Sequence, residues 1–493
     1  MDIVHNVEKY PNLTKKHLKV KLTDFSKGLK TVVTENLLPL RYAINTYNFC
    51  YNKRGLSDGL GVRQLRVYNG NQEKIMNTPA APDSVLGFWV YRLYDTLTGK
   101  LIPLMMIYGD DGKVYFGRVT TSDTEFRDAS MTAPSLPACF NYKLNDENVF
   151  LCCTTNKITV FNAVQNQVFT NSVPSITSAA LHAGRLFATV SNNENRVYFS
   201  DELNPTNWDI SDFDGGYIEL NDDRGKLRRL IESNNYLYVI RDFGISRISA
   251  WGLQSDFSVS NLYVSSGKIY ASTAALCGSI IVVLCKDGLY YFNGYNMQKI
   301  YLGFEKLFEG QDNNSALGAY IDGKYYLACR LNFNDSVSVG CESDAYQNNA
   351  LIEYDLDSGE INILRGVDIS AIAPFETEWA TKLVICLRHG KVCELTHDGM
   401  IDSAPTPKMW SSGYTDLGYP DRKKVLKKLH LVSQTDVVIS VVADGKEYSY
   451  QLNGSNLPVS CNLNIMASMI NITVKCSNNN CEISDVQVEV DLC

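Results

Sequence analysis

The chain has 493 residues, of which 45% are apolar and 20% are charged, and its formal net charge is −8. This composition is normal for a folded protein with a large core, and the acidic balance disfavours a protein whose main task is to grip a nucleic-acid backbone. The N-terminus lacks the apolar segment of a signal peptide, and no run approaches the roughly 18 apolar residues of a membrane span, so we expect folding in a cytoplasm and no membrane contact.

Residues 1–65 are expected to form an extended N-terminal arm. The segment does not alternate cleanly between apolar and polar residues, and Gly28, Pro39, Gly55 and Gly59 divide it into short extended pieces. Short pieces of this kind have too little apolar surface to fold alone. We therefore expect the arm to lie across another part of the protein.

A recurring hairpin predicts that residues 66–404 form a β-propeller. A short alternating apolar run, a tight polar turn and a second such run return about every 36 to 58 residues. One such hairpin cannot bury its apolar face, so the copies must pack on one another. The seven copies begin at Gly112, Asn148, Gly184, Asn235, Gly278, Gly323 and Thr381. The uneven spacing leaves six or seven blades open, and the polar insert from Asn332 to Asn349 is expected to be a long exposed loop.

Residues 405–493 are predicted to form a separate C-terminal β-sandwich. The repeat pattern ends near Pro405 and Pro407, which mark the expected linker. Beyond it, new alternating strands follow, and Asp444-Gly445 is a strong signal for a two-residue hairpin turn. The fold class expected for the whole chain is therefore all-β.

The dense basic run and the cysteines have plain structural interpretations. The run from Asp421 to Lys428 is expected to be a solvated strand edge, with contact to DNA or an acidic partner as the alternative. The 14 cysteines show no zinc-site spacing and are expected to be thiols in a reducing compartment. Among them, Cys476 and Cys481 are placed to face each other across a turn.

The sequence offers no catalytic, cofactor-binding or metal-binding residues, and the protein is expected not to be an enzyme. No nucleophile elbow, phosphate-binding loop or HExxH motif is present. Three acidic loops could supply oxygens to calcium, but Asp, Asn and Gly are also what tight turns require, which favours turns. These loops are Asp212 to Gly216, Asn221 to Gly225 and Asp355 to Glu360. The histidines are His5, His17, His182, His389, His397 and His430, and they form no repeated ligand spacing.

The stretch from Gly184 to Gly252 resembles a pattern in β-propeller virion proteins of tailed bacteriophages. It contains RVYFSD, then NPTNW, a Gly-rich acidic turn, and a final LYVIRDFGI strand. In this pattern we expect Trp208 to fill the gap between neighbouring blades and Gly215-Gly216 to permit a chain reversal. DFSKGL from Asp24, the segment with Asn45, Asn48 and Lys53-Arg54-Gly55, and SGYTDLG from Ser412 are similar to the ends of such proteins.

In size and layout the chain resembles the packaged-DNA stabilisation proteins, also called tail hub or nozzle proteins, of short-tailed phages. The resemblance implies a structural head-to-tail connector of the virion tail, made in the host bacterial cytoplasm. It implies a ring, commonly a homohexamer, that contacts the portal-adaptor and other tail proteins. Genomic DNA would be retained and then passed at ejection without sequence-specific binding and without a cofactor. We expect subunit contacts on the arm from Phe25 to Gly61 and on the C-terminal sandwich.

Two other functions stay open at this point. The Tyr-rich loops and the insert at 332–349 would suit binding of a host surface glycan or protein. A glycosidase would need paired carboxylates across the central channel, and the sialidase-like Asp-box pattern is imitated only loosely and only once, from Ser200 to Trp208.

Overall fold

The computed structural model describes residues 7–9, 17–22, 25, 28–31, 42–51, 55–69, 72–77, 82–118, 125–211, 215–333, 347–376 and 381–493. In these segments the secondary structure is β-strand, with short 3-10 helices at Gln254–Asp256 and Glu305–Phe308. No helix among the described residues has the length and apolar character needed to cross a membrane.

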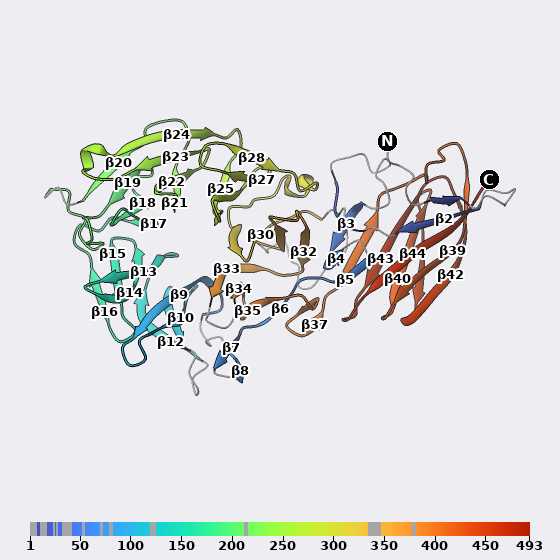
Figure 1. The fold of residues 1–493 in the computed structure, drawn as a ribbon, viewed down its shortest axis with the longest axis horizontal. Coiled ribbons are helices and arrows are strands. Elements are labelled where there is room, and N and C mark those ends of the chain that lie inside the picture. Colours follow the sequence, from blue (N-terminus) through green and yellow to red (C-terminus); the bar gives the residue numbers. More distant parts are fainter. Residues whose placement is uncertain are drawn as a thin grey trace.

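The molecule has two lobes, and both ends of the chain lie at the second one (Figure 1). The first lobe contains seven sheets that follow one another around a centre. Six of them are antiparallel sheets of four strands each, and the seventh has six strands. The second lobe contains two sheets, one of seven strands and one of five. The prediction of an all-β fold with propeller-type sheets is confirmed.

The strands of the first six sheets come in chain order within each sheet. In sheets one to three they are β9 (Val85–Asp95), β10 (Lys100–Gly109), β11 (Lys113–Arg118), β12 (Phe126–Thr132), β13 (Ala138–Leu144), β14 (Glu147–Thr154), β15 (Lys157–Phe161), β16 (Asn166–Phe169), β17 (Ile176–His182), β18 (Arg185–Val190), β19 (Arg196–Phe199) and β20 (Gly216–Glu219). In sheets four to six they are β21 (Leu227–Ser233), β22 (Tyr236–Arg241), β23 (Gly244–Ser249), β24 (Ser258–Val264), β25 (Ile269–Cys277), β26 (Ile280–Cys285), β27 (Gly288–Phe292), β28 (Met297–Ile300), β29 (Leu317–Ile321), β30 (Lys324–Cys329), β31 (Ala350–Asp355) and β32 (Ile361–Arg365).

The seventh sheet is completed by a strand from the N-terminal part of the chain. It consists of β33 (Ile369–Glu376), β34 (Thr381–Leu387), β35 (Val392–Thr396), β6 (Gly61–Gln64), β36 (Met400–Ile401) and β37 (Ala404–Pro405). Strand β6 therefore occupies the fourth position, where the other sheets use their own last strand. The first strand of each sheet contacts the first strand of the next, and β33 contacts β9, so the series closes on itself.

Each of the seven repeats found in the sequence falls on a different sheet. They cover the second strand, the third strand or both, as in β18 with β19 and β22 with β23. Trp208 is buried among residues of β14, β15 and β18, which confirms that it fills the space between two neighbouring sheets. Its indole Nε1–H donates to the Pro205 carbonyl at 2.9 Å, so the turn before it fixes the ring.

Gly215 and Gly216 serve a purpose other than the expected chain reversal. Neither residue has the positive φ that favours glycine. A Cβ on Gly215 would lie 2.8 Å from the Trp208 carbonyl carbon, and one on Gly216 would lie 2.4 Å from the Phe199 ring. These glycines are thus required by close approach to neighbouring atoms rather than by backbone freedom.

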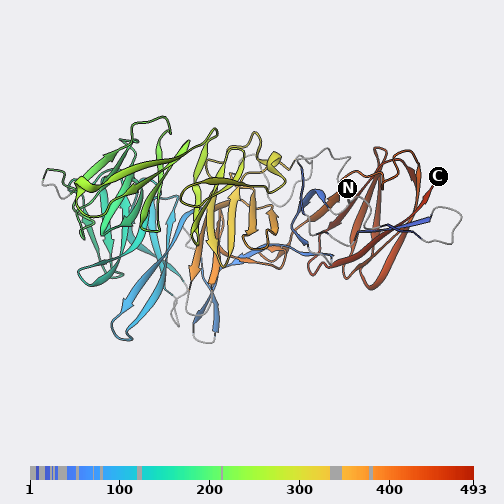
Figure 2. The same ribbon diagram turned by 45° about the horizontal axis from the view of Figure 1, so that its top comes forward.

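Two hairpins project from the same side of the first lobe. One is the long β9–β10 hairpin, and the other is formed by β7 (Arg66–Asn69) and β8 (Gln72–Ile75). Both are blue and extend downward in Figure 2. Because each sheet is an antiparallel meander, its first and third turns lie at one end of the lobe and its second turn lies at the other. We call the end that carries the first and third turns the turn face.

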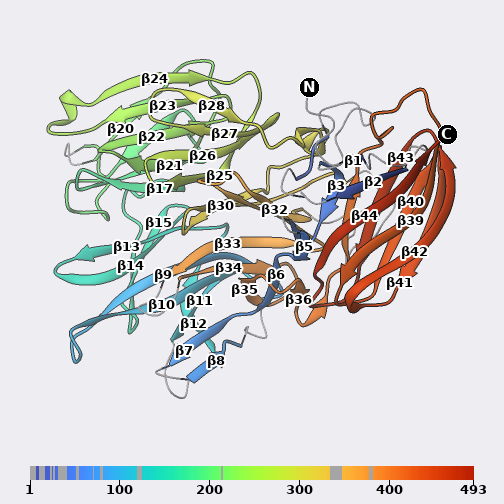
Figure 3. The same cartoon turned by 45° about the vertical axis from the view of Figure 1, so that its right-hand side comes forward.

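The second lobe has two sheets around one core (Figure 3). The first sheet has the order β1-β2-β44-β39-β42, with β5 also pairing β44 and β4 pairing β5, and the second has the order β3-β38-β43-β40-β41. The strands are β1 (Val7–Lys9), β2 (His17–Leu22), β3 (Ala43–Tyr47), β4 (Phe49–Tyr51), β5 (Gly55–Asp58), β38 (Lys408–Ser412), β39 (Lys424–Ser433), β40 (Val437–Ala443), β41 (Lys446–Leu452), β42 (Ser455–Ala467), β43 (Ile470–Cys476) and β44 (Ile483–Leu492).

Details of this lobe match the sequence pattern. Asp444 and Gly445 have φ values of 47° and 85° and join β40 to β41, which confirms the predicted two-residue turn. The chain leaves the seventh sheet at β37 and enters the second lobe at β38, where the linker was expected. The thiols of Cys476 and Cys481 share a hydrogen bond, so they do face each other.

The N-terminal arm is part of this lobe rather than a free extension. Strand β2 pairs β44, β3 pairs β38, and β5 pairs β44. Phe25, at one end of the expected subunit contact, is 1% exposed in the core of the same chain. Gly61, at the other end, pairs with Thr396 in the seventh sheet. The described segments of the arm thus make contacts within their own chain.

The basic run is not a solvated edge strand. Strand β39 pairs on both sides, with β42 and β44. Lys424 is fully buried, and its Nζ donates to the carbonyls of Tyr419 and Ser468 at 2.7 and 2.8 Å. Burial lowers the pKa of this amine. The expectation was wrong for Lys424 because two backbone carbonyls replace its water shell.

Most of the polar insert lies outside the described residues, and its described ends are anchored. Phe333 is 7% exposed and lies beneath the Arg365 guanidinium at 4.2 Å. Asn348 is 1% exposed and donates to the Ile369 carbonyl at 2.8 Å. The prediction of an exposed loop is therefore wrong for Phe333 and Asn348, which are buried.

Candidate functional site

The first strands of the seven sheets together line a central cavity of about 350 Å³. Every one of β9, β13, β17, β21, β25, β29 and β33 contributes to its wall. Small residues on these first strands allow neighbouring strands to pack closely around the cavity. On β29, a Cβ on Gly318 would lie 1.9 Å from the Thr273 carbonyl oxygen, so only glycine fits there.

Two adjacent arginines on β21 bring positive charge to the cavity. Arg228 pairs in a fork with Asp242, with Nε–Oδ1 at 2.8 Å and Nη2–Oδ2 at 3.2 Å. Arg229 instead donates from Nη1 to the backbone carbonyl of Ser272 at 2.9 Å. Among the described residues, no carboxylate forms an ion pair with Arg229. Burial lowers the pKa of this guanidinium.

The cavity does not supply the chemistry of a glycosidase. Such an enzyme uses two carboxyl groups that flank the scissile bond. The described residues that line the cavity include two arginines and no aspartate or glutamate. The wall is otherwise formed by small polar residues such as Ser178 and by rings such as Trp89 and Phe140. This arrangement can hold a small molecule but lacks an acid–base pair.

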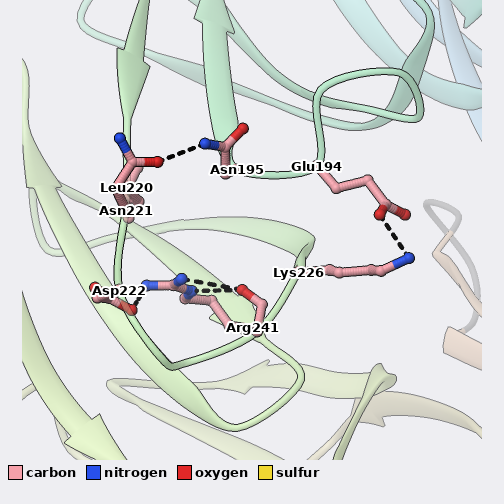
Figure 4. Close-up of a pocket in the computed structure, with 8 residues that line it drawn as sticks. Glu194, Asn195, Leu220, Asn221, Asp222, Lys226 and Arg241 are labelled. Carbon is pink, nitrogen blue, oxygen red and sulfur yellow. Dashed lines mark hydrogen bonds and ion pairs between the residues drawn. The ribbon is translucent and has the colours of Figure 1, made fainter.

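A second pocket, of about 330 Å³, lies where the β18–β19 turn meets the β20–β21 connection. Figure 4 shows that its charged side chains point at one another. The Nη1 of Arg241 lies 2.7 Å from Oδ1 of Asp222, and Lys226 pairs with Glu194. Arg241 is 1% exposed and also donates from Nε and Nη2 to the Gly225 carbonyl. These groups satisfy one another and fix the connection between two sheets.

The acidic loops behave as turns where the structure describes them. The carboxylate of Asp222 is engaged by Arg241 and Arg224, and although burial opposes it, hydrogen bonds from these residues lower its pKa. Asp355 accepts the backbone N–H groups of Asp357 and Ser358 at 3.0 and 2.8 Å. The third loop, at 212–214, lies outside the described residues. These contacts favour the turn interpretation over bound calcium.

The turn face carries exposed apolar side chains. At the tip of the β9–β10 hairpin, Leu97 is 94% exposed, and Tyr94 and Leu101 are exposed on its two strands. On sheets three and four, a group of four exposed residues forms what we call the apolar patch: Leu181, Leu203, Trp251 and Leu253.

Contacts between loops hold this patch together. The backbone N–H of Leu203 donates to the Gly184 carbonyl at 2.7 Å, and the Trp251 ring meets the buried His182 ring at 5.4 Å between centroids. Exposed apolar side chains at one end of a lobe are candidates for contact with a partner.

Sequence reasoning named no site residue and missed the arginine pair. The pair is nevertheless visible in the sequence, because Arg228 and Arg229 interrupt the apolar residues of β21, which runs from Leu227 to Ser233. Of the two histidines near β35, His397 approaches Glu353 at 3.3 Å and His389 lies in the β34–β35 turn. The described part of the chain holds no group of three or more metal-ligating side chains.

The comparisons with known proteins do not assign this chain to a family. No protein-family model matches, and no curated protein matches. The solved structures with some similarity include a crystal structure of BBS1N in complex with ARL6DN, soaked with lead. It has a TM-score of 0.44 and 10% sequence identity, and the match covers 68% of this chain and 98% of that chain.

A second crystal of the same complex, soaked with mercury, has a TM-score of 0.41 and 8% identity. That match covers 63% of this chain and 92% of the other.

Proposed function

We propose that this chain is a structural protein of a bacteriophage tail, of the nozzle or tail hub type, without enzymatic activity. The observation that carries the proposal is the RVYFSD-to-LYVIRDFGI stretch, which resembles such proteins and runs from β19 to the start of β23. In this proposal the seven sheets are the blades of one propeller and the second lobe is a β-sandwich. The protein would act in the virion tail after synthesis in the host bacterial cytoplasm.

The path of the DNA in this proposal runs between copies of the chain. A central cavity of about 350 Å³ has the size of a small-molecule site and does not admit a duplex. Several chains, in the proposed homohexamer, must therefore surround the channel below the portal and adaptor. The net charge of −8 suits a channel wall along which DNA slides, because like charge repels phosphate.

The turn face is our proposed contact between copies of this chain. The arm is used within the chain, whereas the apolar patch is exposed and held on two rigid sheets. Leu203 and Leu253 are each 73% exposed, and burying them against a neighbour would remove apolar surface from water. This replaces the arm as the surface where assembly is expected.

The test is assembly of the purified full chain, measured by native mass spectrometry and negative-stain imaging. We expect rings for the unaltered chain and smaller species for the double variant Leu203→Asp with Leu253→Asp. The matched control is Val264→Asp, because Val264 is 61% exposed but lies at the end of β24, on the side of the first lobe opposite the turn face. A chain that stays monomeric at all concentrations, or a double variant that still forms complete rings, contradicts the proposal.

Binding of a host surface glycan or protein is the second candidate. Tyr295 is 70% exposed in a third turn of the turn face, and exposed aromatic rings of this kind stack on sugars. Glycan-array binding by a monomeric chain, reduced by Tyr295→Ala, would favour this role over the ring.

A further inference from the structure

The structure assigns a binding site for a small organic anion to the central cavity of the first lobe, with Arg229 as its cationic anchor. This inference concerns the cavity inside one chain and does not depend on the role in a virion tail. It rests on three features of the cavity: an arginine without a carboxylate partner, a fixed position for that arginine, and a wall that combines aromatic and hydroxyl groups.

The first feature is the charge of the cavity. The side chain of Arg228 is 41% exposed, and its guanidinium is compensated by the carboxylate of Asp242. Arg229 is partly buried, and its hydrogen-bond partner among the described residues is the neutral Ser272 carbonyl, which engages one of five guanidinium N–H groups. The described lining adds no carboxylate, although the chain as a whole carries a net charge of −8. A bound anion would supply the missing compensation.

The second feature is the fixed position of Arg229. Its strand, β21, lies between β17 and β25 in the ring, and the backbone N–H of its neighbour Leu230 donates a hydrogen bond to Ser178 Oγ at 3.2 Å. The hydrogen bond to Ser272 then holds the guanidinium against β25. Since the strand and the side chain are both held in place, little conformational entropy is lost when an anion binds.

The third feature is the wall, which indicates the rest of the ligand. Trp89 and Phe140 line the cavity and are only partly buried, so their rings can contact an occupant. Thr177 and Ser178 add hydroxyl groups on the neighbouring strand. A ligand with one carboxylate or phosphate and a small apolar or aromatic body matches this combination, and about 350 Å³ is enough for such a molecule.

The experiment titrates the full chain with benzoate and with phenyl phosphate by isothermal titration calorimetry, with benzyl alcohol as the neutral analogue. We expect saturable binding of at least one anion with a stoichiometry of one, and no binding of benzyl alcohol. The two anions distinguish a carboxylate from a phosphate ligand. Absence of saturable binding of both anions would overturn the proposal.

The variants locate the binding. Arg229→Gln should weaken binding at least tenfold, and Arg229→Lys should weaken it less because the charge remains. Ala179→Leu fills the cavity without changing the guanidinium and should also abolish binding. Arg127→Gln is the control, because Arg127 is exposed on the fourth strand of its sheet and does not line the cavity. Melting temperatures verify folding, and unchanged affinity in either Arg229→Gln or Ala179→Leu rejects this site.

Discussion

Phe25 packs edge-on against Trp410, with ring centroids 4.9 Å apart and ring planes at 83°. The two residues lie at opposite ends of the sequence, and both are buried in the core of the second lobe. This contact joins the N-terminal arm to β38, the first strand after the linker. The second lobe is therefore built from two segments, one that precedes and one that follows the first lobe in the sequence.

Replacing Phe25 with alanine should destabilise the second lobe by about 4 kcal/mol, because a fully buried ring is removed and a cavity is left beside Trp410. Urea unfolding followed by tryptophan fluorescence measures the change. Leu457→Ala on the same lobe is the control, and it should change stability by less than about 0.5 kcal/mol since Leu457 is 72% exposed. Equal effects for the two variants would show that the arm does not stabilise the core.

Asn48 joins the two lobes at one point. Its Nδ2 donates to the carbonyls of Arg365 and Pro407 at 3.1 and 2.9 Å, and its Oδ1 accepts from the Arg365 backbone N–H at 2.7 Å. Arg365 ends β32 of the sixth sheet, while Pro407 lies at the linker. The residue is fully buried and has a φ of 60°, which asparagine tolerates better than most residues.

Asn48→Ala should cost about 3 kcal/mol in unfolding free energy, since three hydrogen bonds disappear and buried backbone groups lose partners. We expect limited proteolysis near the linker to become faster as the lobes loosen. Asn235→Ala is the control. Asn235 has nearly the same backbone conformation as Asn48, with a φ of 63°, but it is exposed. Loss of stability that is no greater for Asn48→Ala than for this control would refute the role of the side chain.

The features predicted from sequence are those with a local pattern. The seven hairpins, the Asp444-Gly445 turn and the burial of Trp208 each depend on residues near one another in the chain. The fourth strand of the seventh sheet was not predicted, because β6 pairs with β35 more than 300 residues away and has only four residues. Pairing over such a distance leaves no periodic trace in a single sequence.

The candidate site was beyond prediction for a related reason. The arginine pair is visible in the sequence, but a lone arginine becomes informative only when its surroundings are known. Asp242 compensates Arg228 from a loop 14 residues away, and no carboxylate among the described residues does so for Arg229. Likewise, Lys424 is one of several lysines in a basic run, and only the fold shows that it is buried.

Gly215→Ala tests whether close packing, rather than backbone freedom, explains the glycine in the phage-like motif. The added Cβ would lie 2.8 to 3.0 Å from backbone atoms of Trp208, which cannot move away as a flexible side chain would. We expect a loss of about 2 kcal/mol, measured as a lower melting temperature. Gly267→Ala is the control, because its Cβ would meet only the Lys286 Cβ at 3.2 Å. A Gly215→Ala variant as stable as this control would disprove the packing explanation.

Glu353 is expected to make the stability of the first lobe depend on pH. Its side chain is 2% exposed and contacts Lys324 at 3.1 Å, His397 at 3.3 Å and the Tyr326 hydroxyl at 2.9 Å. Burial by itself raises the pKa of this carboxyl, but hydrogen bonds from His397 and Asn362 and the charge of Lys324 lower it to about 2. Because the folded-state pKa is below the unfolded value of about 4.3, the resulting stability is present above that value and is lost as pH falls toward about 2.

Glu353→Gln should therefore be less stable than the unaltered chain by about 3 kcal/mol at pH 7, and the difference should shrink as pH falls from about 4.5 to about 2. Urea midpoints at a series of pH values measure it. Asp146→Asn is the control, because Asp146 is fully exposed and pairs only with the neighbouring Lys143, so solvent screens the interaction. A difference for Glu353→Gln that stays constant over this pH range would show that the carboxylate charge does not stabilise the fold.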